Sequence, residues 1–514
     1  MKQKIKHGAL VALCALALVA CFDDKGNYDY SALPDFYVDT TGIGIIPLHS
    51  QFDTLRLNSR LVYDNNREDL EFSWTIYLRE APISGNPATL LATTENLVEP
   101  ITVYPSRYWI EFRATEPITG RSAIQRYPIT VESSGSGLLV LYERDGLVDC
   151  DLIKTKLLTG ALASDEVRRS MYTLANPDHP LTGSPVAVDM INYSNVQRFI
   201  SIYTSDDGVK LSPDDMSVRD NFNGLFLFAP RTPRPQGYTV PYGVLMANPG
   251  ETGDGLEILV SDGVCYANMI VFASLTGGGL AVYSERLSTA GDYYAAPYSF
   301  LGFGQIVVYD QLGRRFLSGP TYTTTLAAVV GSGDKFNFSN IGKDLVYLSY
   351  GFKDQYYIYA IFKNPVDNGE RFLYVMNFYG GPTAVAAWDI SSDTGIADAN
   401  LFTFGRRGPT AFYASDNKVY RIPFDLDADS VAPAGEAWSA PAGEEITCLE
   451  LCNYAGRDVQ ENTRDRYLFV GTYNAAGEGK LYIVQMNVTT GACVQEPVAT
   501  FDQFGKIKDV AFKF

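Results

Sequence analysis

Short segments in which apolar and polar residues alternate recur along most of the chain. A period of two places successive side chains on opposite faces of a strand, so such segments predict β-strands with one buried face. Residues 70–77, Leu-Glu-Phe-Ser-Trp-Thr-Ile-Tyr, are typical of the pattern. Runs with the spacing of an amphipathic helix do not interrupt it. We therefore expect an all-β protein.

The first strand-rich region covers residues 34–133 and is predicted to form a small β-sandwich. Trp74 lies within its alternating strand as the core tryptophan of an immunoglobulin-type domain does. We expect both Trp74 and Trp109 to be buried rather than available to a ligand. The small residues from Ser133 to Gly137 predict a hinge that ends this domain.

From residue 134 to residue 514, strand–turn–strand units recur roughly once in 50 to 55 residues, near the length of a four-stranded propeller blade. The units lie at residues 138–153, 199–211, 258–269, 306–317, 372–388, 411–422 and 467–486. They predict a β-propeller, with seven blades as the first choice. A ring of six or eight blades and a pair of sandwiches are the alternatives.

The end of the chain supports closure of such a ring. Residues 507–514 form one more predicted strand, whereas the unit at 138–153 lacks a preceding inner strand. A C-terminal strand that completes the first blade removes an open sheet edge, which is a common device in propellers. We therefore expect the propeller to be closed by the C-terminal strand.

The N-terminus carries a targeting signal. Three lysines precede the apolar run Gly8–Ala20, which is too short to span a bilayer as a helix. Leu18-Val19-Ala20-Cys21 resembles the bacterial lipobox. The resemblance implies that residues 1–20 are a signal peptide, that Cys21 is lipidated, and that residues 21–33 link the lipid anchor to the sandwich. The alternative is an ordinary secretory signal with a chance cysteine.

Asp23 and Asp24 follow the cysteine and resemble the surface-export signal of Bacteroidetes lipoproteins. The resemblance implies a protein anchored in the outer membrane by lipid alone and exposed at the cell surface. A solvated acidic linker is the alternative, and it would leave the orientation open. The net charge of -18 argues against nucleic acid as a partner and against a basic patch that binds membranes.

Cysteine and histidine usage adds little chemistry. Beyond Cys21 the mature chain would hold five scattered cysteines and no Cys-x-x-Cys pair, which is not a disulfide framework. Cys448 and Cys452 share one face of a predicted strand and are expected to be buried thiols. Only His49 and His179 would remain, and no nucleophile motif accompanies them. We predict no catalytic residue, no cofactor and no enzymatic activity.

One acidic segment has partial calcium-loop spacing. Asp425, Asp427, Asp429 and Glu436 occupy positions one, three, five and twelve of such a loop. However, Ser430 stands where the loop needs glycine, and no helix flanks the segment. A solvated connection between blades is the better interpretation, so no metal site is assigned.

Aromatic residues offer the candidate ligand site. Tyr293, Tyr294 and Tyr298 lie beside Gly291 and Pro297, in the most loop-like of the aromatic clusters. Exposed tyrosines of this kind stack on sugars and other planar ligands. Burial between neighbouring blades is the alternative.

The combined features resemble the PKD-like family lipoproteins of Bacteroidetes. The resemblance is carried by Cys21, the segment Asp23–Tyr30, the Phe72-Ser73-Trp74 strand and the passage 137–153. It implies a non-catalytic surface lipoprotein that binds a glycan, a peptide or another nutrient, or a transporter partner, in an outer-membrane SusC/SusD-type uptake system. A propeller hydrolase or lyase acting on an extracellular polymer is one alternative, favoured by carboxylates clustered at the central channel. A surface adhesin or protein-binding scaffold is another, favoured by a broad apolar patch.

Overall fold

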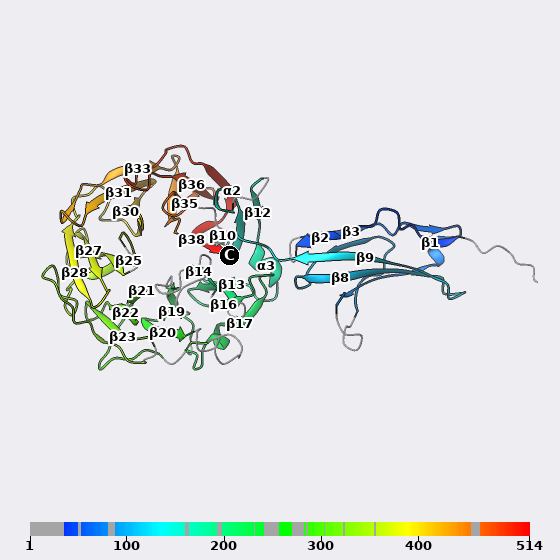
Figure 1. The fold of residues 1–514 in the computed structure, drawn as a ribbon, viewed down its shortest axis with the longest axis horizontal. Helices are drawn as coiled ribbons and strands as arrows, with labels where there is room; N and C mark the ends of the chain where they lie inside the picture. The colour runs from blue at the N-terminus through cyan, green and yellow to red at the C-terminus, as the bar shows by residue number, and fades with distance from the viewer. Residues whose placement is uncertain are drawn as a thin grey trace, which may run out of the picture.

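The computed structural model describes residues 35–49, 53–80, 88–159, 164–192, 198–230, 232–240, 256–269, 282–283, 286–302, 304–321, 324–353, 356–453 and 463–513. Strands dominate this part of the chain, and its helices are four short turns. They are η1 (Arg67–Asp69), α2 (Lys156–Thr159), α3 (Met171–Ala175) and η2 (Phe222–Leu225). The prediction of an all-β protein is confirmed. A sandwich and a ring of sheets follow one another along the chain (Figure 1).

The sandwich consists of one larger sheet and two small ones. The larger sheet has the order β2 (Ile46–His49), β9 (Ser122–Glu132), β8 (Ser106–Thr115), β5 (Glu71–Leu78) and β6 (Thr89–Ala92). The small sheets pair β1 (Phe36–Val38) with β4 (Leu61–Tyr63), and β3 (Thr54–Leu57) with β7 (Leu97–Pro100). The parallel pairing of β2 with β9 is the exception among otherwise antiparallel ladders.

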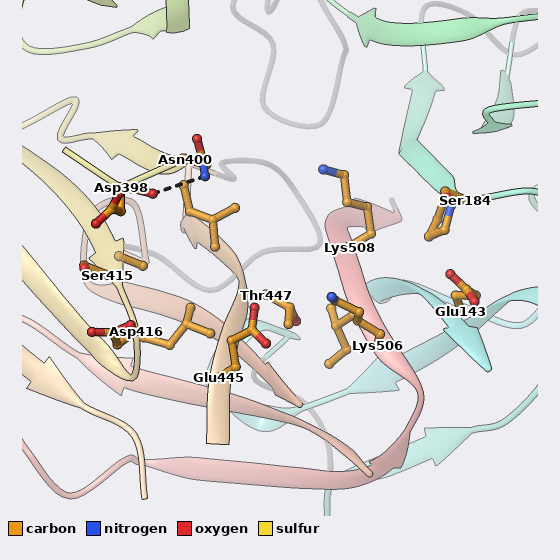
Figure 2. Close-up of a pocket in the computed structure, with 15 residues that line it drawn as sticks. Glu143, Ser184, Asp398, Asn400, Ser415, Asp416, Glu445, Thr447, Lys506 and Lys508 are labelled. Atoms are coloured by element: carbon orange, nitrogen blue, oxygen red, sulfur yellow. Dashed lines mark hydrogen bonds between the residues drawn. The ribbon is translucent and has the colours of Figure 1, made fainter. Parts of the chain in front are cut away.

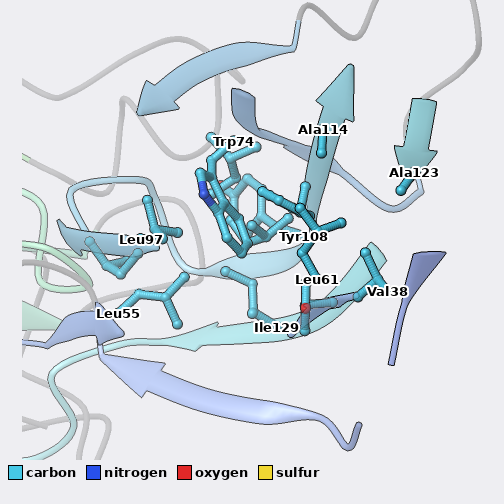
Figure 3. Close-up of a cluster of buried hydrophobic side chains, with 14 of the residues drawn as sticks. Val38, Leu55, Leu61, Trp74, Leu97, Tyr108, Ala114, Ala123 and Ile129 are labelled. Carbon is cyan, nitrogen blue, oxygen red and sulfur yellow. The ribbon is translucent and has the colours of Figure 1, made fainter. Parts of the chain in front are cut away.

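Trp74 lies at the centre of the sandwich core, with no exposed surface (Figure 3). Its indole Nε1 donates to the carbonyl of Thr94 at 3.0 Å, so burial leaves no polar atom unsatisfied. The prediction that Trp109 is buried in the core is wrong. Trp109 sits one residue away from the buried Tyr108 on β8, on the opposite face, where the Arg79 guanidinium lies 4.6 Å above its ring.

The rest of the chain forms seven successive sheets in the described residues, and in Figure 1 they are arranged around a centre. The first sheet has β38 (Lys506–Lys513), β10 (Gly137–Arg144), β11 (Leu147–Lys154) and β12 (Glu166–Arg168), with β13 (Leu181–Thr182) also on β11. The second has β14 (Pro185–Asn192), β15 (Arg198–Thr204), β16 (Gly208–Leu211) and β17 (Val218–Asn221). The third has β18 (Pro235–Thr239), β19 (Leu256–Ser261) and β20 (Val264–Met269).

The fourth sheet has β21 (Ala295–Gly302), β22 (Gln305–Asp310), β23 (Arg315–Pro320) and β24 (Ala327–Ala328). The fifth has β25 (Asp344–Tyr350), β26 (Tyr357–Lys363), β27 (Arg371–Asn377) and β28 (Thr383–Asp389). The sixth has β29 (Leu401–Phe404), β30 (Thr410–Ser415), β31 (Lys418–Asp425), β32 (Ser430–Val431) and β33 (Gly435–Ser439). The seventh has β34 (Glu444–Leu451), β35 (Tyr467–Asn474), β36 (Gly479–Gln485) and β37 (Ala499–Phe504).

The inner strands close the ring. Each contacts the next in the cycle β38, β14, β18, β21, β25, β29, β34 and back to β38. The first sheet joins the two ends of the ring, because β38 pairs antiparallel with β10. This propeller architecture places the inner strands side by side around a central channel.

The hairpins that defined the predicted repeat are present. Each of the seven segments named above contains an antiparallel pair of adjacent strands. At Asp145-Gly146 and Asp262-Gly263 both turn residues have positive φ, which is the geometry that Asp-Gly favours in a two-residue hairpin loop. Local turn chemistry therefore fixes the register of these blades.

Candidate functional site

A cavity at one mouth of the ring has a volume of about 560 Å³. We call it the mouth cavity. It lies at or near the first residues of the inner strands β14, β29, β34 and β38, and the hairpin turn at Asp416 borders it. It is lined by Glu143, Ser184, Pro185, Asp398, Asn400, Leu401, Ala414, Ser415, Asp416, Glu445, Ile446, Thr447, Lys506, Ile507 and Lys508 (Figure 2).

The mouth cavity carries charges of both signs. Lys506 and Lys508 both line the cavity from β38, whose register with β10 shifts between Ile507 and Asp509. Figure 2 shows Asp398 and Asp416 away from them, Glu445 in between, and Glu143 on the side of the lysines. Within the described residues neither ammonium group forms an ion pair. The cavity can therefore attract ligand groups of either charge to separate places.

A second cavity, of about 200 Å³, lies further along the same inner strands, and we call it the channel cavity. Three carboxylates line it: Asp189 on β14, Glu450 on β34 and Asp509 on β38. Tyr238 and Tyr347, from β18 and β25, complete its wall. The inner strands of five different sheets thus each contribute at least one polar side chain to the channel.

Burial raises the pKa of the channel acids. Removal from bulk water is the largest cause for each, and the negative charge of Asp509 adds to it for Asp189 and Glu450. The pKa of Asp189 rises to about 8. For Asp509, backbone N–H donors and Lys508 oppose the rise without cancelling it. Burial therefore favours the protonated form of all three carboxyl groups over what they would show in water.

The channel acids are held partly by the backbone. Asp189 Oδ1 accepts a hydrogen bond from the N–H of Met190 at 2.7 Å. Asp509 Oδ2 accepts from the N–H of Val188 at 2.8 Å, which links β38 to β14. These bonds orient the carboxylates along the wall. Within the described residues no group of three His, Cys, Asp or Glu side chains could hold a metal ion.

The three candidate tyrosines lie in different surroundings. Tyr293 is half-buried, and its hydroxyl donates to the carbonyl of Leu287 at 2.7 Å and accepts from the N–H of Cys265. Tyr294 is 43% exposed and its hydroxyl accepts from Gln236 at 2.7 Å. Tyr298 contacts the ring of Tyr347, and burial raises the pKa of Tyr298 to about 12. None of the three lines the mouth cavity or the channel cavity.

The acidic segment after β31 does not gather its carboxylates. Asp427 lies 3.4 Å from the ammonium of Lys353, Asp429 pairs with Lys335, and Glu436 pairs with Lys418. Asp425 instead accepts hydrogen bonds from two N–H groups of its own turn. Each side chain thus has a separate partner, as expected of a solvated connection between strands.

The cysteines named in the sequence analysis lie partly inside and partly outside the described residues. Cys448 and Cys452 are buried free thiols, as predicted. Cys21 and the acidic pair behind it lie outside the described residues. No helix in the described part of the chain is long and apolar enough to cross a membrane.

Sequence reasoning missed the charged residues of both cavities. A usable signal was present, because Asp189 interrupts the apolar segment 186–191 and Glu450 interrupts the segment 446–452. A charged residue inside an otherwise apolar strand faces either solvent or a functional cavity. Which of the two applies depends on ring closure, which brings strands distant in sequence together.

Fold and cavities together define a β-propeller that follows an N-terminal sandwich and has polar cavities along the described parts of its inner strands. Residues 21–185 match the model of the PKD-like family. The match extends from the segment before the sandwich to the first residue of β14. The N-terminal part of the chain therefore contains a PKD-like domain.

One solved structure supports the fold over nearly the whole chain. A quinonprotein alcohol dehydrogenase-like protein from Bacteroides thetaiotaomicron VPI-5482 is 14% identical with a TM-score of 0.50, and the alignment covers 94% of this chain and 100% of that one. Apo AztD from Citrobacter koseri is 9% identical with a TM-score of 0.36, covering 86% and 98%. At such identities the first similarity concerns the fold alone. No curated protein matches the chain.

Proposed function

We propose that this protein is a non-catalytic binding protein of an outer-membrane SusC/SusD-type uptake system, which captures a nutrient in its mouth cavity. The cavity itself carries the proposal. A volume of about 560 Å³ lies within the range of small-ligand sites, and charged and hydroxyl side chains converge on it from several sheets. A PKD-like domain followed by a propeller fits a binding scaffold.

The proposed location follows from the N-terminus. Lipidation at Cys21 would anchor the chain in the outer membrane, and Asp23 and Asp24 would direct it to the cell surface. The PKD-like domain would then separate the ring from the lipid and offer a docking surface to the transporter. The ring would present its cavity to incoming nutrients.

Purification of the native lipoprotein from detergent-solubilised outer membranes tests this proposal. We expect a SusC/SusD-like pair to co-purify, identified by mass spectrometry. A Cys21→Ala variant is the matched control, because loss of the lipid should release the protein from the membrane fraction. Recovery of the wild type alone, without a transporter, would contradict the uptake role.

The channel acids favour a second candidate, a hydrolase or lyase acting on an extracellular polymer. Paired carboxyl groups with different pKa values are what general acid and base catalysis requires. Against this, Asp189 and Asp509 are bound by backbone N–H groups and the channel cavity is only about 200 Å³. The test is to incubate the protein with a panel of polysaccharides and measure the reducing ends that are released. Release by the wild type that is lost in Glu450→Gln would establish this candidate and overturn the first.

A further inference from the structure

The mouth cavity carries charges of both signs. Its positive charges come from Lys506 and Lys508 on β38 of the first sheet. Its carboxylates are Glu143 on β10, which pairs with Lys506 in the strand register, Glu445 on β34, Asp398 before β29 and Asp416 in the turn after β30. Figure 2 shows Asp398 and Asp416 away from the lysines, so the cavity is not uniformly acidic.

The two lysines of the cavity lie among carboxylates without pairing with them. With a net charge of -18, the protein has many more carboxylates than basic groups. Several lysines elsewhere pair with acids, as Lys418 does with Glu436 at 2.6 Å. Within the described residues Lys506 and Lys508 form no such pair, although acids line the same cavity. Both ammonium groups thus stay available to an anionic group of a ligand.

Among the described residues of the lining none is aromatic, so they offer no ring on which a sugar could stack. They provide two ammonium groups, four carboxylates, and hydroxyl and amide groups beside apolar side chains. A ligand that matches this pattern carries a carboxylate and an ammonium group separated by a short polar backbone. Such a molecule is a short peptide with free ends.

We infer that the mouth cavity takes a short zwitterionic peptide, with its carboxylate at Lys506 and Lys508 and its ammonium group toward Asp416 and Glu445. This inference rests on the proposed function and names the ligand class. A cavity of about 560 Å³ has room for a peptide of a few residues. The peptide's own amide groups would meet the hydroxyl and amide side chains of the lining.

Calorimetric titration of the full-length protein with trialanine tests the inference. The comparison ligands are C-amidated trialanine, N-acetylated trialanine and maltotriose, which lack the carboxylate, the ammonium group and both charges respectively. We expect each blocked peptide to bind at least about tenfold more weakly than trialanine, because one charge-assisted contact is lost. Maltotriose should not bind measurably.

Substitutions test which residues bind each end of the peptide. The double variant Lys506→Gln/Lys508→Gln should bind trialanine about tenfold or more weakly, yet bind C-amidated trialanine as the wild type does, since this peptide has no carboxylate for the lysines. The double variant Glu445→Gln/Asp416→Asn should likewise bind trialanine more weakly and leave the binding of N-acetylated trialanine unchanged. Lys353→Gln, which alters a lysine outside the cavity, is the matched control and should bind as the wild type does.

Three results would overturn the inference: no binding of trialanine at millimolar concentration, equal binding of free and blocked peptides, or preference for maltotriose. Circular dichroism and unfolding curves of each variant show whether a loss of binding reflects misfolding. If the transporter pair still co-purifies while trialanine fails to bind, the uptake role stands and only the peptide assignment falls. If neither is seen, both fall.

Discussion

At the scale of single residues, the clearest feature is a fully buried ion pair between the second and third sheets. The ammonium of Lys210 on β16 contacts Glu257 on β19, and both side chains are inaccessible to solvent. Tyr238 donates to the second oxygen of Glu257 at 2.7 Å, and Lys210 lies 4.2 Å above the ring of Phe199. Removal of one charge leaves the other without compensation in a medium of low polarity.

Lys210→Met should therefore lower the free energy of unfolding by about 3 to 5 kcal/mol, as measured by urea denaturation. Lys353→Gln, which breaks the exposed pair with Asp427, should change it by less than about 1 kcal/mol. A loss below about 1 kcal/mol in Lys210→Met would contradict the view that this pair is isolated from water.

Asp189 makes stability depend on pH. Its pKa is about 8 in the folded chain, against about 3.9 for an aspartate in an unfolded one. Between these values the folded state holds a proton that the unfolded state has released. The free energy of unfolding therefore falls as pH rises through this window, is highest below about pH 4 on this account, and reaches its low plateau above about pH 8.

Asp189→Asn removes the charge and should abolish this dependence. We expect the variant to be more stable than the wild type at pH 9 by about 1 to 2 kcal/mol, after allowance for water in the channel, and nearly equal at pH 4. Denaturation curves at a series of pH values measure the difference. A difference that stays constant with pH would show that Asp189 is charged in the folded state throughout.

At the scale of elements, β38 determines whether the ring closes. It pairs with β10 along nearly its whole length, from Gly137 opposite Lys513 to Glu143 opposite Lys506. Apolar side chains of β38 such as Phe512 pack in the core shared by the first and seventh sheets. Without β38, the β10 edge would be an unpaired strand that other chains can join.

A chain that stops at Gly505 should therefore form oligomers or aggregates, detected by size-exclusion chromatography with light scattering. Addition of a synthetic peptide of residues 506–513 should restore the monomer, because the peptide supplies the missing strand. A scrambled peptide of the same composition is the control. A monomeric truncated chain that unfolds cooperatively would contradict the role of β38.

Strands and turns could be predicted best from the sequence, because their formation depends on residues that are neighbours in the chain. Alternation located the hairpins, and Asp-Gly pairs such as Asp145-Gly146 marked their turns. Alternation did not decide which face was buried, so Trp109 was assigned to the core although it lies under Arg79. Asp189, Glu450 and Asp509 are more than fifty residues apart, and only ring closure brings them to one cavity.

At the scale of the whole molecule, the sandwich and the ring have separate cores. The sandwich cluster contains residues between Val38 and Val131, and the ring clusters described here contain residues between Leu138 and Phe512. Polar contacts join the two parts, such as the hydroxyl of Tyr104 donating to Asp214 at 2.8 Å. Parts with separate cores and few shared contacts unfold separately.

Differential scanning calorimetry should therefore show two transitions. Trp74→Ala should shift only one of them, because it removes about 3 to 5 kcal/mol of packing from the sandwich core. Phe412→Ala, a change at a fully buried position between the sixth and seventh sheets, should shift only the other. A single transition that moves as a whole in both variants would show that the two parts unfold together.

The pairing of β38 with β10 also sets the order of events during synthesis. More than three hundred and fifty residues separate the two strands along the chain, so nearly the whole ring must leave the ribosome before the first sheet is complete. The sandwich, whose contacts are local by comparison, can fold while the rest is still emerging. Until the last strand arrives, the growing chain carries an open sheet edge that chaperones would have to cover.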